Sequence, residues 1–321
     1  MLQIVEPLAQ SPFLTADKRL IVGLEFTNAC NFRCPICPQA YRYKKLPQPA
    51  GAKYDRAIGN ISNTVFHRIV EECERVAKTV ELNFFGEQTL HPRYKQFLKV
   101  LAKRKHFLLV TNTNMSLMDE SIMDAWIEAK FDQIRLSIDA IDDEVFDIAR
   151  PGKVKDLQGN SLKTNRLGAI HEKMHLWFNK PDHRPTRLVF VESQYNKGQS
   201  TRFIDYWKPF LGPKDELIVK PVLSYGGKIE DPTIGSGTCN VWDLKMCQLD
   251  WQGNVSPCNL DVNMDLSMGN IMQDSLADIY YSDRAEKLSK RTGCGNDIEP
   301  CKTCTDSNFW DGTIRIQGTG N

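Results

Sequence analysis

Short apolar runs alternate with longer amphipathic stretches through the first two thirds of the chain. Runs that predict strands lie at residues 20–26, 80–85, 107–111, 133–138, 188–192 and 217–222. The stretches between them predict helices near residues 64–78, 94–103, 120–129, 162–178 and 202–211. In the first of these, apolar side chains recur at helical spacing, at Phe66, Ile69, Val70, Cys73 and Val76. The alternation predicts about six parallel strands with helical crossovers, and places functional residues on loops at the carboxyl ends of strands.

This regular alternation ends near residue 224. The stretch SYGGKIEDPTIGSG at residues 224–237 contains glycine and proline at the density of a linker. Beyond it the chain is punctuated by cysteines, which is typical of a small domain whose core is partly replaced by a metal site. We therefore predict an N-terminal extension at residues 1–19, a strand-and-helix domain at 20–225 and a C-terminal domain at 226–321.

Charge and hydropathy narrow the classes of function. The 321 residues carry 41 Lys and Arg against 40 Asp and Glu, so electrostatics give no reason to expect nucleic acid or a membrane surface as a partner. The N-terminus has no basic region followed by an apolar core, and no stretch approaches the roughly eighteen apolar residues of a spanning helix. We expect a cytoplasmic protein that binds neither nucleic acid nor membrane.

Ten cysteines are many for such a chain. In a reducing compartment they are more often metal ligands or catalytic groups than disulfides. Three lie at positions 30, 34 and 37, one at 73, and six at 239, 247, 258, 294, 301 and 304. This distribution predicts two metal-binding regions at opposite ends of the chain.

The stretch CNFRCPIC, residues 30–37, follows the first predicted strand. A structural zinc site needs four closed ligands, whereas an iron–sulfur cubane held by three cysteines leaves one iron open. The spacing C-x3-C-x2-C in this loop resembles the signature of radical S-adenosylmethionine (SAM) enzymes. The resemblance implies that Cys30, Cys34 and Cys37 hold a [4Fe–4S] cluster whose open iron binds SAM. It also implies a reductase, flavodoxin or ferredoxin as electron donor, and a 5'-deoxyadenosyl radical that abstracts hydrogen from a C–H bond.

Further stretches at the expected strand ends support the resemblance, which covers roughly residues 20–225. FFGEQTLHP resembles the Gly-Gly-Glu segment that binds the amino group of SAM; Phe85, Gly86 and Glu87 are the matching residues, and the sequence departs from the pattern at Phe85. The implied fold is a partial (β/α)6 TIM-like barrel, within the α/β class.

The remaining matches are single residues. Asn112 matches the asparagine of a Thr-Asn-Gly stretch, and Ser137 and Asp139 match polar positions that face the ribose and carboxylate of SAM. Arg150 is implied as a carboxylate partner, and Ile36 as the apolar position whose backbone meets the adenine. Taken singly, the polar matches Asn112, Ser137 and Asp139 are better explained as strand-end caps and turn residues, and only their joint occurrence favours the resemblance.

The C-terminal cysteines resemble a SPASM or Twitch extension, which holds one or two auxiliary iron–sulfur clusters. A full two-cluster SPASM domain carries further cysteines after the C-x2-C pair, and none occurs after Cys304. One auxiliary [4Fe–4S] cluster is therefore expected, with Cys239, Cys258, Cys301 and Cys304 as ligands. A zinc ribbon is the alternative, although zinc has no redox chemistry.

Two cysteines of this region, Cys247 and Cys294, then have no assignment, and either could replace one of the four as a ligand, because loop geometry and not spacing decides. Cys247 lies in an alternating run and is explained most simply as a small buried side chain. The sharper hypothesis makes one of the two a hydrogen-atom donor, so that the enzyme would be an epimerase. Cys73 lies on the apolar stripe of a predicted helix and is assigned to the core.

The family includes enzymes that oxidise or epimerise sugars and cyclitols, and enzymes that modify peptides. Many peptide maturases carry a leader-binding domain of about eighty residues, whereas only about twenty residues precede the first predicted strand here. A polar small molecule of the sugar or cyclitol type is therefore the expected substrate, with a peptide as the alternative. A non-catalytic iron–sulfur or zinc protein is the competing class.

Overall fold

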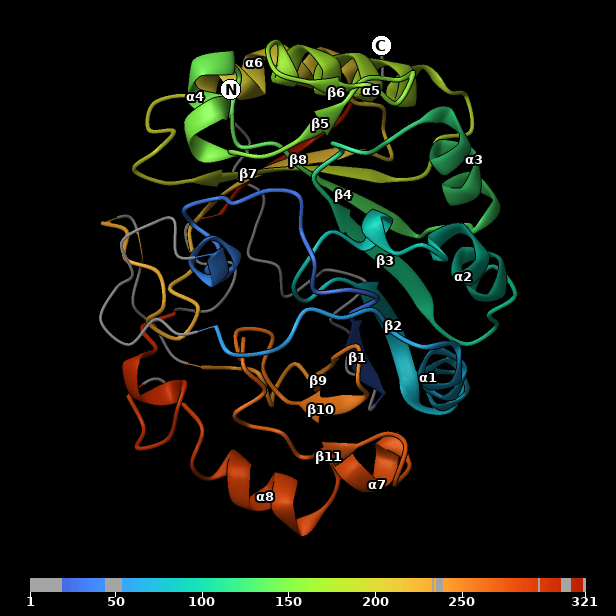
Figure 1. The fold of residues 1–321 in the computed structure, drawn as a ribbon, viewed down its shortest axis with the longest axis vertical. Helices are drawn as coiled ribbons and strands as arrows, with labels where there is room; N and C mark the ends of the chain where they lie inside the picture. Colours follow the sequence, from blue (N-terminus) through green and yellow to red (C-terminus); the bar gives the residue numbers. More distant parts are fainter. Residues whose placement is uncertain are drawn as a thin grey trace.

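One mixed sheet organises the computed structural model, which describes residues 19–43, 54–232, 234, 239–293, 295–306 and 313–319 (Figure 1). Its ten strands lie in the order β11-β10-β9-β1-β2-β3-β4-β7-β8-β12. Six neighbouring strands run parallel and follow the chain order, as the sequence predicted: β1 (Leu20–Leu24), β2 (Ala77–Leu82), β3 (Leu108–Thr113), β4 (Gln133–Ser137), β7 (Thr186–Glu192) and β8 (Glu216–Pro221). The fold is the expected α/β partial barrel.

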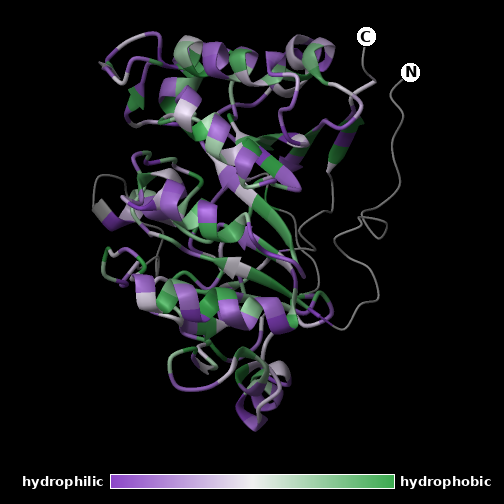
Figure 2. Cartoon of the chain, turned by 90° about the vertical axis from the view of Figure 1, so that its right-hand side faces the viewer, coloured by the Kyte–Doolittle hydropathy of each residue, from purple (hydrophilic) through white to green (hydrophobic). Residues whose placement is uncertain are grey.

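Helices connect these strands and cover the outer side of the curved sheet (Figures 1 and 2). They are α1 (Asn63–Val76), α2 (Tyr94–Leu101), α3 (Glu120–Glu128), α4 (Asp143–Ala149), α5 (Arg166–Asn179) and α6 (Ser200–Trp207). Side chains cap two of them, since Ser62 accepts a hydrogen bond from an N–H in the first turn of α1 and Asp119 does the same for α3. Short 3₁₀ segments are η3 (Pro38–Tyr43), η4 (Gln88–Leu90), η5 (Lys208–Phe210) and η6 (Cys301–Thr303).

The segment between β4 and α5 differs from the prediction. It contains the seven-residue helix α4 and a small hairpin of β5 (Val154–Lys155) and β6 (Ser161–Leu162). Both are too short to show a period of their own in the sequence. The helix expected at 162–178 therefore begins later, at Arg166.

Alternate residues of the parallel strands face opposite sides of the sheet. Leu136, Leu188 and Leu217 are paired across β4, β7 and β8 and belong to the hydrophobic core beneath the helices. The preceding residue in each strand is charged, and Arg135 and Arg187 face the inside of the barrel, where they line a cavity. The inner face thus carries charged side chains beside apolar ones such as Val189 and Ile218, whereas the outer face is apolar.

The C-terminal segment extends the same sheet at both edges. β9 (Met246–Leu249) pairs parallel with β1, and a hairpin joins it to β10 (Asn254–Ser256) and β11 (Gly269–Asn270). α7 (Leu276–Tyr280) and α8 (Asp283–Ser289) follow. β12 (Ile314–Gln317) then pairs antiparallel with β8 at the other edge. The predicted domain limits remain predictions, and residues 1–18 of the predicted extension lie outside the described residues.

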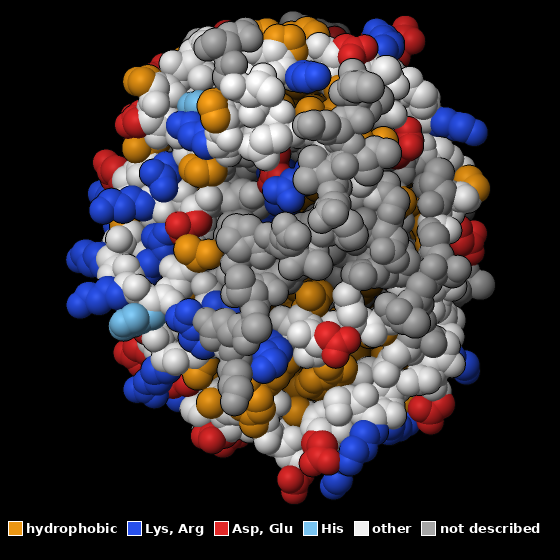
Figure 3. All heavy atoms as spheres, turned by 180° about the vertical axis from the view of Figure 1, so that it is seen from behind, with side chains coloured by type: hydrophobic (Ala, Val, Ile, Leu, Met, Phe, Trp, Pro, Cys, Tyr) orange, Lys and Arg blue, Asp and Glu red, His pale blue; other side chains and the backbone are white. Residues whose placement is uncertain are grey.

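The surface seen in Figure 3 carries Asp and Glu side chains among the Lys and Arg side chains, in keeping with the formal net charge of +1. In the part of the chain that the structure describes, none of the helices has the length and apolar character needed to cross a bilayer.

A buried ion pair joins the first strand to the C-terminal hairpin. Both carboxylate oxygens of Glu25 accept hydrogen bonds from Arg56 at 2.8 Å, and the two side chains are 0% and 8% exposed. The Glu25 carboxylate also accepts a hydrogen bond from the backbone N–H of Trp251, in the β9–β10 turn, at 3.4 Å. The pair therefore fixes this turn against the end of β1.

Replacing Arg56 by methionine is expected to lower the free energy of unfolding by about 3–5 kcal/mol, because it leaves the Glu25 carboxylate buried without its cation. Urea unfolding under anaerobic conditions measures the change. The matched control is Arg202→Met, which removes an exposed pair with Asp142 (62% and 39% exposed) and is expected to cost less than about 1 kcal/mol. Equal losses in the two variants would refute a special role for the buried pair.

Candidate active site and auxiliary cysteine site

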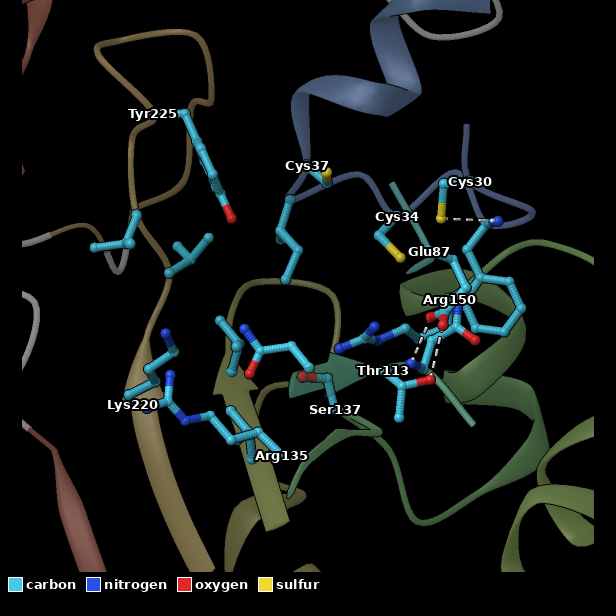
Figure 4. Close-up of a pocket in the computed structure, with 18 of the residues that line it drawn as sticks. Cys30, Cys34, Cys37, Glu87, Thr113, Arg135, Ser137, Arg150, Lys220 and Tyr225 are labelled. Atoms are coloured by element: carbon cyan, nitrogen blue, oxygen red, sulfur yellow. Dashed lines mark hydrogen bonds between the residues drawn. The ribbon is translucent and has the colours of Figure 1, made fainter. Parts of the chain in front are cut away.

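A cavity of about 290 Å³ opens inside the barrel at the carboxyl ends of the strands (Figure 4). It is bounded by the loop after β1 and by the ends of β2, β3, β4, β7 and β8. The residues predicted to bind the cluster or SAM that line this cavity include Cys30, Cys34, Ile36, Cys37, Gly86, Glu87, Asn112 and Ser137. Arg150 also lines it. The tertiary structure therefore brings these positions of four strand ends and their loops to one place.

The three thiols come from the loop that follows β1, where Cys37 donates a backbone hydrogen bond to the carbonyl of Cys34 at 2.9 Å. Burial raises the pKa of the Cys37 thiol to about 12, and it also raises the pKa values of Cys30 and Cys34. Buried thiols of this kind become thiolates when a metal supplies positive charge. The donor set fits a cluster held by three cysteines.

Gly86 allows the cysteine loop to approach the end of β2. Its φ is +96°, and a Cβ at this position would lie 2.2 Å from the backbone oxygen of Thr27 and 2.7 Å from that of Ala29. The N–H of the next residue, Glu87, donates to the Ala29 oxygen at 2.8 Å. Glycine is required here because the two backbones touch.

The Glu87 carboxylate is held from the β3 side of the cavity. One oxygen accepts hydrogen bonds from the hydroxyls of Thr113 (2.9 Å) and Thr89 (2.7 Å), and the other accepts from the N–H of Asn114 (2.9 Å). Burial raises the pKa of Glu87, while the hydrogen bonds act in the opposite direction. Thr113, which stands where the family pattern has glycine, therefore orients the carboxylate, a role the sequence did not indicate.

Of the predicted pair Asp139 and Arg150, only Arg150 lines the cavity. Asp139 is fully buried, does not line the cavity, and accepts a hydrogen bond from the Val191 N–H at 2.8 Å. Its other carboxylate oxygen is ion-paired with Arg150. The prediction that Asp139 faces SAM directly is thus wrong, because the carboxylate lies behind Arg150 and positions it. Arg150 reaches the cavity and stands close enough to Cys34 to act on the pKa of that thiol.

Phe85 also does not line the cavity. Its ring packs against the rings of Tyr54, Phe84 and Tyr225, and its carbonyl accepts a hydrogen bond from Gln88 at 3.3 Å. Phe85 therefore belongs to an aromatic cluster beside the site and does not face the cavity.

Several lining residues were not predicted from the sequence. Arg135, Arg187 and Lys220 reach the cavity from β4, β7 and β8, and Tyr225 from the turn after β8. The alternation of side chains along a strand could have identified Arg135. It stands two residues before the predicted Ser137, and residues two apart in a strand face the same side of the sheet.

A second, smaller cavity is lined by all four predicted auxiliary ligands, Cys239, Cys258, Cys301 and Cys304, together with apolar side chains. Burial raises the pKa of Cys258, and the neighbouring thiols of Cys239 and Cys301 raise it further. Within the described residues, no three His, Cys, Asp or Glu side chains converge closely enough to hold a single metal ion. The thiols instead surround the cavity, which suits a cluster in which each thiolate binds a different iron.

The two cavities share a wall. Tyr225 lines the first and the next residue, Gly226, lines the second. The Asp306 carboxylate holds this turn, accepting hydrogen bonds from the hydroxyl of Ser224 at 2.8 Å and from the N–H of Gly226 at 3.2 Å. Asp306 follows Cys304 by two residues. The segment that carries the auxiliary cysteines therefore also holds the turn that borders the barrel cavity.

The structure corrects the hydrogen-donor hypothesis for Cys247. The side chain is 0% exposed, belongs to the hydrophobic core and lies near Cys73, not at the cavity. Its strand position explains this, because Cys247 pairs with Val22 of β1, whose side chain is also in the core. Cys294 lies outside the described residues.

Comparison with known proteins supports the same assignment. Residues 24–163 match the family model of the radical SAM superfamily, and residues 239–305 match that of the SPASM iron–sulfur cluster-binding domain. The tungsten-containing aldehyde ferredoxin oxidoreductase cofactor-modifying protein of Pyrococcus furiosus is 25% identical over 309 residues, covering 81% of this chain and 80% of the relative. The GTP 3',8-cyclase of Vibrio vulnificus is 24% identical over 210 residues, covering 61% and 60%.

Solved structures share the fold. BtrN in complex with AdoMet and 2-DOIA has a TM-score of 0.52 at 14% identity, covering 86% of this chain and 87% of that one. Streptococcus suis SuiB bound to its precursor peptide SuiA has a TM-score of 0.64 at 14% identity, covering 90% and 72%. Native anSMEcpe with bound AdoMet has a TM-score of 0.58 at 17% identity, covering 83% and 82%.

The chain belongs to the radical SAM superfamily, and it carries a C-terminal SPASM domain. Its cofactors are therefore SAM, the [4Fe–4S] cluster that binds SAM, and auxiliary iron–sulfur in the C-terminal segment. The two cysteine-lined cavities agree with this assignment in the number and type of their ligands.

Proposed function

We propose that this radical SAM enzyme oxidises a polar small molecule of the sugar or cyclitol type. The single observation that carries the reaction class is that the Cys30, Cys34 and Cys37 thiols line one cavity with Glu87, inside a barrel whose inner face carries charged side chains. When bound, the cluster and SAM supply a 5'-deoxyadenosyl radical that abstracts a hydrogen atom from a C–H bond.

The chain's own residues have three tasks in this proposal. The three thiolates hold the cluster, and the Glu87 carboxylate, fixed by Thr113, binds the amino group of SAM. Asn112 and Ser137 offer hydrogen-bonding groups to the rest of the SAM molecule. The residues of β7 and β8 that line the cavity are left to contact the substrate.

Oxidation is the outcome we favour over epimerisation. Among the described cysteines, Cys73 and Cys247 alone lie outside the two cysteine-lined cavities, and both are buried in the core. Neither can reach a substrate in the barrel to return a hydrogen atom. The wall that the two cavities share, at Tyr225 and Gly226, supports transfer of an electron between the substrate site and the auxiliary site.

Anaerobic reconstitution followed by incubation with SAM and dithionite tests the proposal. We expect 5'-deoxyadenosine to form, with reduced flavodoxin or ferredoxin able to replace dithionite. Iron and sulfide without SAM cleavage would instead indicate a non-catalytic iron–sulfur protein, and tightly held zinc without iron would indicate a zinc ribbon.

The substrate class is tested with extract from cells grown in heavy water. Deuterium should enter 5'-deoxyadenosine when the low-molecular-mass fraction is added. Deuterium transfer from the peptide fraction alone would contradict the small-molecule proposal and assign the enzyme to peptide modification.

A further inference from the structure

Three cations reach the barrel cavity at the end away from the cysteines. Lys220 comes from β8, Arg135 from β4 and Arg187 from β7, and all three line the cavity. Figure 4 shows Lys220 and Arg135 together on the side opposite Cys30 and Cys34. Strand pairing places Arg135 directly beside Arg187, and Val191 beside Lys220.

The carboxylates that pair with these cations do not line the cavity. Arg135 bonds both oxygens of Glu81, at 2.9 and 3.2 Å. Arg187 and Arg315 share one carboxylate, that of Glu216. Two carboxylates thus face three arginines, and Lys220 adds a fourth positive charge.

Lys220 is the least compensated member of the network. No hydrogen bond or ion pair joins its ammonium group to any described residue. Burial and the nearby cations Arg135 and Arg187 together lower the pKa of Lys220 to about 8, against the opposing effects of Asp139 and Glu81. Lys220 is partly buried at the cavity wall and its ammonium group has no acceptor among the described residues, so an anion in the cavity would supply one.

We propose that Lys220, with Arg135 and Arg187, binds an anionic group of the substrate, a phosphate or a carboxylate. This inference rests on the proposed function, because it places the substrate in the same cavity as SAM. Arginine offers a planar fork and lysine a point charge, and both suit these anions. The carboxylate of SAM is a different anion, since it belongs at the cysteine end of the cavity. The substrate would then be held by its anion at one end and present a C–H bond toward the cysteines.

Calorimetric titration of the reconstituted, SAM-loaded enzyme tests the inference without turnover. Inorganic phosphate and acetate are the two probes. The probe that binds more tightly indicates whether the anionic group of the substrate is a phosphate or a carboxylate. In Lys220→Met the tighter probe should bind roughly tenfold or more weakly, because a charge-assisted hydrogen bond is lost. Lys220→Arg should retain much of the affinity.

The matched control is Lys197→Met, which removes an exposed lysine and should leave anion affinity unchanged. Affinity for SAM, measured by equilibrium dialysis, should be equal in all variants. Unchanged anion affinity in Lys220→Met, or no binding of either probe to the parent enzyme, would overturn the inference. Failure of SAM cleavage with Lys220-dependent anion binding would instead refute the proposed reaction and leave the anion site standing.

Discussion

Gly86→Ala is expected to lower the rate of SAM cleavage roughly a hundredfold or more, because displacement of the reacting groups by about 1 Å has this effect. The added Cβ would meet the backbone oxygens of Thr27 and Ala29 at 2.2 and 2.7 Å, and backbone cannot rotate away as a side chain can. The loop that must move leads directly into Cys30. The φ of +96° adds strain for any residue with a side chain.

The control for this variant is Gly159→Ala. Gly159 also has a positive φ, +87°, but a Cβ there would meet nothing within 4 Å. It therefore reproduces the backbone strain without the collision. SAM affinity by equilibrium dialysis and iron content should fall in the Gly86 variant and stay near the parent values in the Gly159 variant. Equal effects would mean that strain, and not the contact with the cysteine loop, explains the loss.

Replacing Cys30, Cys34 and Cys37 together by alanine is expected to abolish SAM cleavage and to lower the iron content from about eight to about four per chain, since each cubane holds four irons. The cavity lined by Cys239, Cys258, Cys301 and Cys304 should remain loaded, because its ligands are untouched. Iron and sulfide analysis and electron paramagnetic resonance of the reduced protein measure the outcome.

Cys247→Ala is the matched control for the loss of a thiol. Its side chain lies in the core, so the variant should lose some stability but keep both clusters and SAM cleavage. Loss of iron in this variant would show that Cys247 is a ligand and would contradict the ligand set drawn here. A triple variant that still contains about eight irons would contradict the assignment of the barrel cluster.

The sequence predicted the barrel well where the periodic segments of apolar residues were long. All six strands and five of the helices that alternate with them were predicted. The strands showed as short apolar runs and the helices as apolar residues at helical spacing. It missed α4 and the β5–β6 hairpin, whose seven and two residues are too short for a period to show. It also could not show that β9 pairs with β1, since that contact joins residues more than two hundred positions apart.

For the candidate site, too, local motifs were predicted correctly and the directions of single side chains were not. The cysteine spacing and the Gly86–Glu87 turn were readable because they are local motifs, and both line the cavity. The role of Asp139 was misjudged, because the sequence indicates that a strand end is polar but not whether its carboxylate faces the ligand or an arginine. Cys247 presented a similar ambiguity, which its pairing with Val22 resolves.

The sequence by itself determined the type of the candidate ligands: three thiols in one loop, a carboxylate after the second strand and a group of six cysteines in the C-terminal part of the chain. Only the tertiary structure decided which side chains share a cavity, that Tyr225 and Gly226 divide two cysteine sites, and that Lys220, Arg135 and Arg187 meet inside the barrel. The physical reason is that ligand chemistry is a property of single residues and short spacings. The direction of a side chain, in contrast, depends on strand register and on how distant strands pair and curve.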